Sequence, residues 1–580
     1  MGQWTAAFGV AAASADIKPA QSPQQRISIP HNKSPNMQNS PGIAERSCFP
    51  CRRSKRRCDK SSPFCRLCIR KGVACSYPKH RGQRQPSSSH SAESGWNTMP
   101  TPDVTEPDPE PIYASPIHVS PTQSNANSSI ISAIHFMAPK VFQEAQLIIP
   151  RSDSAIPNDV AAYVGDPQQI RDMAIAFFSF SAWWMPIICR KRFFSSALNP
   201  LSPPPRELVL LALCMKLFCS PLPPNAEAGQ TDLYKTAKRF YSELEASGIT
   251  SIRVLQAALF IAIYEIGHAI YPAAYFTVGI CARYGSALGL DNSLTDHMGD
   301  CGLGQSWLEI EEMRRVWWGV LILDRMLNFG CPSRCLATKD PTFDNYLPVD
   351  DELFLSGTAK PSDSVSISAG FHLKMGAFAR IAQATYLLTQ VFQSINSPAL
   401  NIADPAASFK ETTAQLRRTL RALVQATEEE VSIRQLAFCC QAAICYCGLL
   451  LLQDHYWQLL GIRSTQDAYD GMFQETRSIL ESIWPVVSDL GSEMAEGNIT
   501  ERNLTLFLAQ LLYQVTATAT TIGQGEPDRE IKERIDICKR LLQLMEPRWR
   551  VARVYVAILN VREAAMTSAN KLMDWRNFEI

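Results

Sequence analysis

Six cysteines between residues 48 and 75 constrain this chain more than any other feature, because they form two halves of identical spacing. The first half reads Cys-x2-Cys-x6-Cys from Cys48 to Cys58, and the second repeats that pattern from Cys65 to Cys75. Two tetrahedral zinc ions need eight metal–ligand bonds, so six thiolates are enough only if two sulfurs each bridge both metals. The spacing therefore predicts one compact cluster of two Zn²⁺ and six ligands: Cys48, Cys51, Cys58, Cys65, Cys68 and Cys75.

A disulfide framework is the alternative use of these six cysteines. Such frameworks belong to small secreted proteins without a large core, whereas this chain has 580 residues, enough for a small module and a large body. The other cysteines stand mostly in apolar runs such as Leu211 to Phe218. That is typical of buried free thiols in a reducing compartment, so zinc is favoured over disulfides.

The charge of the chain is segregated around this cluster. The net charge is only +1, but from Arg46 to Arg84 there are thirteen Lys or Arg against a single acid, Asp59. A local basic block predicts a polyanionic partner even where the charge of the whole chain predicts none. Because the basic residues are interleaved with the proposed zinc ligands, we expect that partner to be nucleic acid.

The rest of the chain predicts a mainly α protein with one small module and one large all-α body. Long runs carry apolar residues at helical spacing, for example Leu255, Leu259 and Ile263, and few segments alternate as strands do. Polar, proline-rich segments bury too little apolar area to offset their ordering entropy. The expected division is a disordered segment 1–45, a zinc-binding, nucleic-acid-binding module 46–84, a flexible Pro/Ser-rich linker 85–164, an all-helical domain 165–569 and a tail 570–580.

The two most apolar stretches do not predict membrane spans. Met173 to Cys189 and Leu436 to Leu452 are about one turn short of the length that a bilayer requires, or are broken by Pro186 and Gln441. We expect both to be buried core helices, and no membrane partner.

The cysteine-rich segment resembles the fungal Zn₂Cys₆ binuclear cluster of transcription factors. The resemblance lies in Cys48-x2-Cys51-Arg52-x2-Lys55-x-Arg57-Cys58-Asp59, followed by Pro63-x-Cys65-x2-Cys68-x6-Cys75. Such modules place a helix in the major groove of DNA. The resemblance implies that Cys48 and Cys65 are the bridging ligands.

The same resemblance assigns roles to the basic residues. Lys55 matches the lysine that reads a CGG-type triplet, where guanine offers O6 and N7 as adjacent acceptors. Ser54 departs from many relatives, which have a second basic residue at that position. The remaining basic residues are expected to meet phosphates and so to set register and affinity. They are Arg52, Arg53, Arg56, Arg57 and Lys60.

The helical body carries a second resemblance, to the fungal-specific transcription-factor regulatory domain. Similar stretches are 254–265, Gly279-x2-Ala282-Arg283, and 314–325, although Gly330-Cys331-Pro332 replaces the usual Gly-Arg-Pro. Trp317 and Trp318 are expected to pack in the core and not to form a ligand box. Asp324 and Arg325 are adjacent and are therefore expected to pair elsewhere and not with each other.

No enzyme is predicted. Asp350-Asp351-Glu352 is the one cluster that suggests a Mg²⁺ site, but Phe354 stands where an Asp-Asp-x-x-Asp pattern needs its last carboxylate. Glu265-x2-His268 lacks the first histidine of a zinc-protease helix. We find no P-loop, nucleophile elbow or Rossmann fingerprint.

These observations predict a zinc-dependent regulator in the nucleus that binds double-stranded DNA at CGG-like half-sites and controls RNA polymerase II genes. Regulators of this layout often control one pathway, so a pathway-specific activator is expected, for example of a secondary-metabolite gene cluster. The transcription machinery or a coactivator is an expected partner, a homodimer stays open, and any small-molecule effector is unknown. The alternative is a ligand-sensing or partner-binding helical scaffold in which the cluster is a secondary nucleic-acid or import element.

Overall fold

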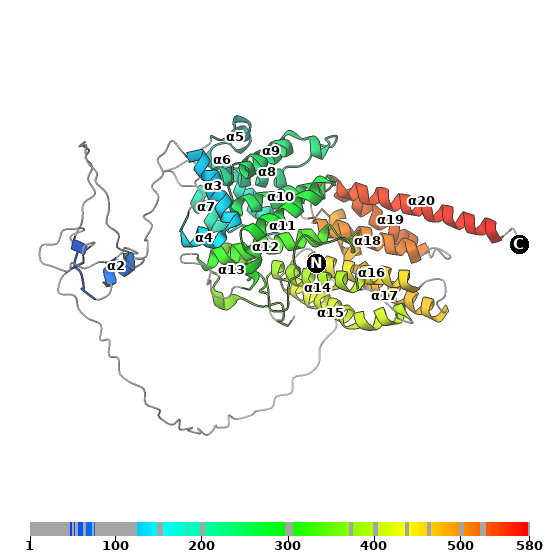
Figure 1. The fold of residues 1–580 in the computed structure, drawn as a ribbon. Helices are drawn as coiled ribbons and strands as arrows, with labels where there is room; N and C mark the ends of the chain where they lie inside the picture. The colour runs from blue at the N-terminus through cyan, green and yellow to red at the C-terminus, as the bar shows by residue number, and fades with distance from the viewer. Residues whose placement is uncertain are drawn as a thin grey trace, which may run out of the picture. The chain divides into compact units, whose positions relative to one another are not determined.

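The computed structural model divides the chain into two units, Met1–Ser115 and Pro116–Ile580, which we consider one at a time (Figure 1). The predicted disorder of residues 1–45 lies outside the residues that the structure describes, as do Arg53 and Lys55. The described residues are 47–48, 51–52, 56–61, 65–71, 75, 124–147, 155–181, 184–197, 204–295, 306–370, 375–397, 404–434, 440–460, 466–497, 504–522 and 529–577.

The second unit is built from helices, which confirms the mainly α prediction. Within the described part of this unit, the only strand-like pairing is an isolated bridge between Tyr346 and Ser366. The helices up to the middle of the unit are α3 (Ser124–Met137), α4 (Pro139–Glu144), α5 (Asn158–Val164), α6 (Pro167–Ser181), α7 (Arg190–Ala197), α8 (Arg206–Cys219), α9 (Asp232–Ala246), α10 (Ile252–Gly267), α11 (Ala273–Ala287) and α12 (Trp307–Met326).

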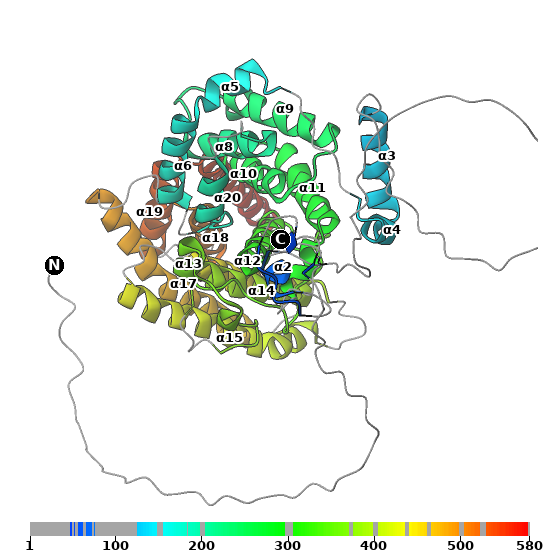
Figure 2. The same cartoon turned by 90° about the vertical axis from the view of Figure 1, so that its left-hand side faces the viewer.

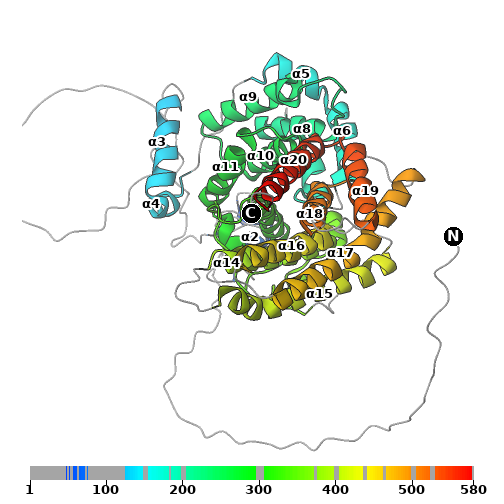
Figure 3. The same cartoon turned by 90° about the vertical axis from the view of Figure 1, so that its right-hand side faces the viewer.

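The second half of this unit continues in the same way. Figure 3 looks along the last helix, with α8 to α11 on one side of it and the helices α14 to α17 on the other. These later helices are α13 (Asp351–Ser356), α14 (Ala377–Ile395), α15 (Pro405–Arg434), α16 (Cys440–Leu460), α17 (Gln466–Ala495), α18 (Leu506–Ile522), α19 (Arg529–Met545) and α20 (Val551–Asn577).

Some helices fall where the sequence predicted a linker or a tail. Helices α3, α4 and α5 lie within residues 85–164, and α20 continues into residues 570–580. The domain boundaries themselves stay predictions.

Helix α10 lies at the centre of the first half and packs along α8. Its residues from Val254 to Gly267 are all buried, as are Leu208 to Met215 of α8. A helix that is apolar on every side is stable only when other helices surround it, which explains the absence of a polar stripe in both sequences. Every helix in the described residues is too short or too polar to span a bilayer.

Helix α12 begins after Ser306, whose backbone N–H donates to the carboxylate of Glu309 at 2.8 Å, one half of a capping box. From Ile310 to Met326 nearly every side chain is buried. Trp317 is 3% exposed and Trp318 is fully buried, which confirms that they belong to the core. The indole N–H of Trp318 donates to the carbonyl of Tyr346 at 3.0 Å.

Helix α12 also buries three charged residues that form one network. The carboxylate of Glu311 receives Arg314 through one oxygen and Arg315 through the other, both at 2.9 Å, and all three side chains are fully buried. Arg315 reaches Asp351 at 2.8 Å and donates to the carbonyl of Val349 at 2.6 Å. Buried charges require this kind of complete pairing, because an unpaired one would be very costly.

The acidic residues 350–352 lie beside this network, and two of them bind the ends of helices. Asp350 caps α13 by accepting from the N–H of Glu352 at 3.0 Å, and Asp351 accepts from the N–H of Phe378 at 3.1 Å. Both carboxylates are therefore committed to helix ends, where negative charge is favourable. In the described residues, the groups of His, Cys, Asp and Glu that could hold a metal all lie in the cysteine-rich module.

The expectation for Asp324 and Arg325 was wrong in one respect. Each has remote partners, since Asp324 accepts from the N–H of Thr338 and Arg325 pairs with Asp340 at 2.8 Å. However, Arg325 also lies 3.3 Å from the Asp324 carboxylate. Both side chains point into the same loop, 337–340, so they meet although they are neighbours on the helix.

Candidate zinc and DNA-binding site

The backbone of the first unit turns at each Cys-x2-Cys pair. After Cys48 the N–H of Arg52 donates to the Cys48 carbonyl at 3.0 Å, and the N–H of Arg56 donates to the Cys51 carbonyl at 2.9 Å. In the second half, Cys65 directly precedes helix α2 (Arg66–Lys71). A helical turn brings the sulfurs of positions i and i+3 to the same side, which is what two ligands of one metal require.

Four buried thiols converge between these two turns. The Sγ of Cys48 lies 3.7 Å from that of Cys65 and 3.6 Å from that of Cys68, and the Sγ of Cys51 lies 3.6 Å from that of Cys65 and 3.8 Å from that of Cys68. Zinc–thiolate bonds of about 2.3 Å at tetrahedral angles put neighbouring sulfurs about 3.8 Å apart. The described sulfurs therefore fit a zinc site, and every described cysteine of the chain is a free thiol.

The third cysteine of each half completes the group. The thiol of Cys58 lies 3.8 Å from the Sγ of Cys48, and the Sγ of Cys75 accepts from the N–H of Cys65 at 3.3 Å. All six predicted ligands thus meet in one place. Cys48 contacts three other sulfurs, and the sulfurs of Cys48, Cys51, Cys65 and Cys68 all lie within 4.8 Å of one another.

The pKa values of the thiols differ because of their hydrogen bonds. Burial alone would raise the pKa of Cys65, but hydrogen bonds from the Cys68 N–H and from neighbouring thiols lower it to about 6. Burial raises the pKa of Cys48 and raises that of Cys68 to about 12. A metal ligand must be a thiolate, so zinc binding releases protons here.

Asp59 joins the two halves, a role that sequence reasoning missed. Its carboxylate accepts from the N–H of Arg66 at 3.1 and 3.2 Å, which caps the start of α2. The hydroxyl of Ser61 also donates to it and, as the largest cause, holds the pKa of Asp59 below its usual range. The available signal was the position of an acid seven residues before a helix start, which is too far for a local capping motif.

The basic residues stand on the outside of this cluster. Arg52, Arg56 and Arg57 are exposed and Lys60 is half-buried, with a left-handed backbone at φ 60°. Arg66 is also exposed, with 91% of its side chain accessible, and it was not among the predicted contacts. Exposed arginines beside an apolar, thiol-rich centre can reach phosphate oxygens without desolvating a buried charge.

Comparison with known proteins assigns both parts of the chain. Residues 46–84 match the model of the fungal Zn(2)-Cys(6) binuclear cluster domain, and residues 174–423 match that of the fungal specific transcription factor domain. No enzyme family takes part in these matches.

Three curated relatives are similar to this chain. Transcription factor BOA15 of Botryotinia fuckeliana is 40% identical over 27% of this chain and 84% of its own length. Transcription factor tazR of Aspergillus terreus is 29% identical over 27% of this chain, which spans only 25% of that relative. The azaphilone cluster-specific transcription factor azaR of Aspergillus niger is 24% identical over 57% of this chain and 67% of its own length.

Four observations indicate the same family: the cluster of cysteine thiols, its basic surroundings, the two domain matches and the similarity to BOA15. The chain binds zinc and DNA and regulates transcription, and it belongs to the family of fungal transcription factors that carry a Zn(2)-Cys(6) binuclear cluster domain.

Proposed function

We propose that the six cysteines hold two Zn²⁺, with Cys48 and Cys65 as the bridging ligands. The observation that supports this is the convergence of the sulfurs, in which Cys48 has three others within 3.6 to 3.8 Å. Bound zinc supplies a structural cross-link that fixes the two halves of the module against each other. Both halves then hold the metals, while the first half also carries most of the basic residues.

The module reads a CGG-like half-site in the major groove. Lys55 donates to O6 and N7 of a guanine, which is the contact that distinguishes one base pair from another. The surrounding basic side chains bind phosphates and release counterions, so they set affinity and register. These phosphate contacts are Arg52, Arg53, Arg56, Arg57 and Lys60.

The protein acts in the nucleus as a pathway-specific activator of RNA polymerase II genes. The names of two relatives support control of a secondary-metabolite gene cluster: the azaphilone cluster-specific factor azaR, and the citrinin biosynthesis activator ctnR of Monascus purpureus. The helical body would then contact a coactivator or the transcription machinery. A homodimer on paired half-sites is the simplest way to extend a short recognition sequence.

One experiment tests the DNA reading directly. The full chain, loaded with zinc, is titrated against a labelled duplex that contains CGG and against the same duplex with CGG scrambled, by fluorescence anisotropy. We expect tighter binding to the CGG duplex, loss of the difference after a zinc chelator is added, and recovery when zinc is restored. Specific binding that survives complete removal of zinc would contradict the proposal.

A further inference from the structure

A cavity of about 720 Å³ lies against α11, and no role in DNA binding explains it. Figure 2 shows α3 standing beside α11, and residues of both helices line the cavity. Helix α3 contributes Phe136 to the cavity wall. Helix α11 contributes Tyr275, Phe276, Gly279, Ile280 and Arg283. We call this space the α11 cavity. Its volume is typical of sites that hold a small organic molecule, which range over about 300–1,000 Å³.

The walls of the α11 cavity expose an unusual amount of aromatic surface. Phe276 is 60% exposed, Phe136 is 56% exposed, and Ile280 and Tyr275 are 38% and 37% exposed. Leaving apolar area in water costs about 25 cal/mol per Å², and a contiguous apolar patch of this kind marks a binding surface in soluble proteins. A flat aromatic molecule would cover these side chains.

Gly279 forms an open part of the cavity wall. A Cβ atom built at this position would have no atom within 4 Å, so neighbouring protein groups do not require a glycine there. A glycine inside a helix costs about 0.5–1 kcal/mol relative to alanine. Its structural effect here is to leave room beside Phe276 and Ile280, where a ligand can approach the backbone of α11.

The charges around the cavity favour an acidic group on that ligand. Arg283 is exposed, and no carboxylate in the described residues lies within ion-pair distance of it. Outside the lining residues, the guanidinium of Arg334 lies 5.2 Å from the centre of the ring of Tyr275, which lines the cavity. Of the two acids on the wall, Asp324 already accepts two backbone N–H groups and lies 3.3 Å from Arg325, so Glu245 is the one remaining acid beside Arg283.

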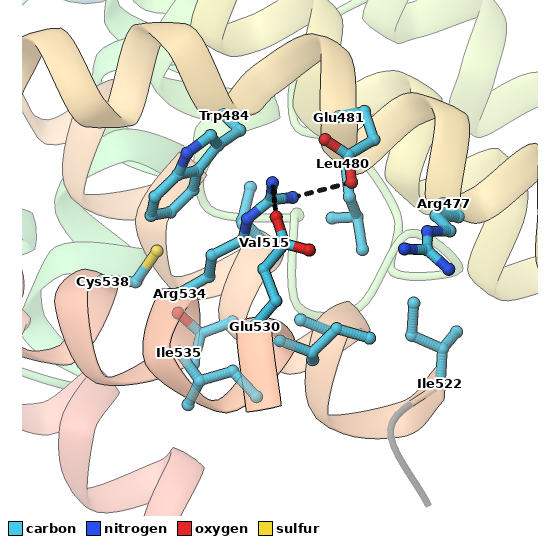
Figure 4. Close-up of a pocket in the computed structure, with 13 residues that line it drawn as sticks. Arg477, Leu480, Glu481, Trp484, Val515, Ile522, Glu530, Arg534, Ile535 and Cys538 are labelled. Carbon is cyan, nitrogen blue, oxygen red and sulfur yellow. Dashed lines mark hydrogen bonds and ion pairs between the residues drawn. The ribbon is translucent and has the colours of Figure 1, made fainter. Parts of the chain in front are cut away.

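A second pocket shows what an unsuitable site looks like. Figure 4 shows the space between α17, α18 and α19, which has a volume of only about 30 Å³, enough for about one or two water molecules. Arg534 crosses it, pairing with Glu481 at 2.8 Å and Glu530 at 2.5 Å and lying 4.8 Å from the centre of the Trp484 ring. Its cation is already neutralised, so this pocket offers neither room nor charge.

We propose that the α11 cavity is a binding site for a small aromatic molecule that carries one acidic group. The apolar side chains of α3 and α11 would cover its rings, and Arg283 would pair with its anionic group. This proposal goes beyond the reading of DNA by the zinc cluster, and it does not depend on whether Lys55 contacts a base. It gives the helical body a ligand-sensing function of defined chemistry.

The test uses 8-anilinonaphthalene-1-sulfonate, an aromatic anion that fluoresces in apolar surroundings, with the full zinc-loaded chain. Gly279→Leu places a side chain on the cavity wall at a position where a Cβ atom meets no other atom within 4 Å, and it puts a good helix former into α11. The matched control is Gly471→Leu, because Gly471 is also a helical glycine with nothing within 4 Å but lies in α17, away from the cavity. We expect saturable binding that weakens at least tenfold in Gly279→Leu and is unchanged in Gly471→Leu.

A second pair of measurements isolates the charge. Arg283→Gln should weaken the sulfonate probe about tenfold but leave binding of its uncharged analogue, N-phenyl-1-naphthylamine, unchanged. Equal binding of the sulfonate probe to the Gly279→Leu and Gly471→Leu variants would overturn the proposal. So would a concentration-dependent dimer that Gly279→Leu disrupts in sedimentation, since a second copy of the chain would then occupy this face.

Discussion

The guanidinium of Arg315 lies 2.8 Å from the carboxylate of Asp351, and this pair connects α12 to the start of α13 inside the protein. Arg315 is fully buried, and its guanidinium carbon lies over the ring of Phe354, 4.1 Å from the ring centre. The Arg315 cation thus depends completely on the carboxylates of Glu311 and Asp351. Removing either side of such a pair leaves a buried charge without compensation.

Arg315→Ala should therefore lower the free energy of unfolding by about 3–5 kcal/mol. The measurement is denaturant unfolding of the full chain followed by tryptophan fluorescence. Arg553→Ala is the control, since 74% of the Arg553 side chain is exposed beside Glu546. The control should change stability by no more than about 0.5 kcal/mol, and a loss below about 1 kcal/mol for Arg315→Ala would contradict the role of the buried network.

Lys55→Ala should reduce discrimination between bases. We expect a loss of about 1–3 kcal/mol at the contacted base pair, because the lysine supplies hydrogen bonds to guanine edges. Arg57→Ala is the comparison: as a phosphate contact, it should weaken binding to all duplexes alike and reduce the dependence of affinity on salt. If both variants weaken all duplexes equally, Lys55 is a phosphate contact and not the reader of the base.

Substitution of a bridging cysteine should reduce the number of bound zinc ions more than substitution of a terminal cysteine does. Cys48→Ser removes a ligand shared by both metals, whereas Cys75→Ser removes a ligand of one metal. Native mass spectrometry of each variant counts the bound ions directly, with Cys331→Ser as a control outside the cluster. Full loading with two ions in Cys48→Ser would argue against the bridging assignment.

The pH dependence of the free energy of unfolding should reveal the lowered pKa of His268. Burial, together with Arg548 and Arg550, lowers the pKa of His268 from 6.5 to about 3, and its Nδ1 has no hydrogen-bond partner among the described residues. Between pH 6.5 and 3 the unfolded chain therefore binds a proton that the native chain excludes, so stability is present above pH 6.5 and is lost as pH falls. The contribution lost at pH 5 is about 2 kcal/mol.

The measurement compares wild type with His268→Gln at pH 7 and pH 5. The variant should lose less stability over this interval than wild type. Asp454→Asn provides the opposite sign, because burial raises the pKa of Asp454 to about 6 and the native carboxyl group takes up a proton as pH falls from 7 to 5. Wild type gains stability from that group and Asp454→Asn does not, so identical pH profiles for all three proteins would contradict both assignments.

Local patterns in the sequence were sufficient for the elements of the fold. The 3.6-residue spacing of Leu255, Leu259 and Ile263 predicted a helix, and all three are buried in α10. The cysteine spacing likewise predicted the group that the structure brings together. In both cases the signal lies within one turn or one short repeat, so no knowledge of distant contacts was needed.

The remaining features depend on contacts between distant segments. Arg314 and Arg315 look like surface charges in the sequence. A buried position is tolerable because Arg314 reaches the distant carbonyl of Ser293 and Arg315 reaches Val349 and Asp351. Gly279 is one glycine among 28, and its position on a cavity wall follows from how α3 and α11 lie together. Asp59 was counted as a lone acid, because the helix that it caps begins seven residues later.

The single guanidinium of Arg315 also limits how the body can be divided. It holds the carbonyl of Val349 and the carboxylate of Asp351, and that carboxylate in turn holds the first turn of α14 through Phe378. A fragment that ends after α12 would contain a fully buried cation without two of its partners, Val349 and Asp351. We therefore expect α12, α13 and α14 to be inherited, truncated or transplanted only together, as one indivisible segment of the chain.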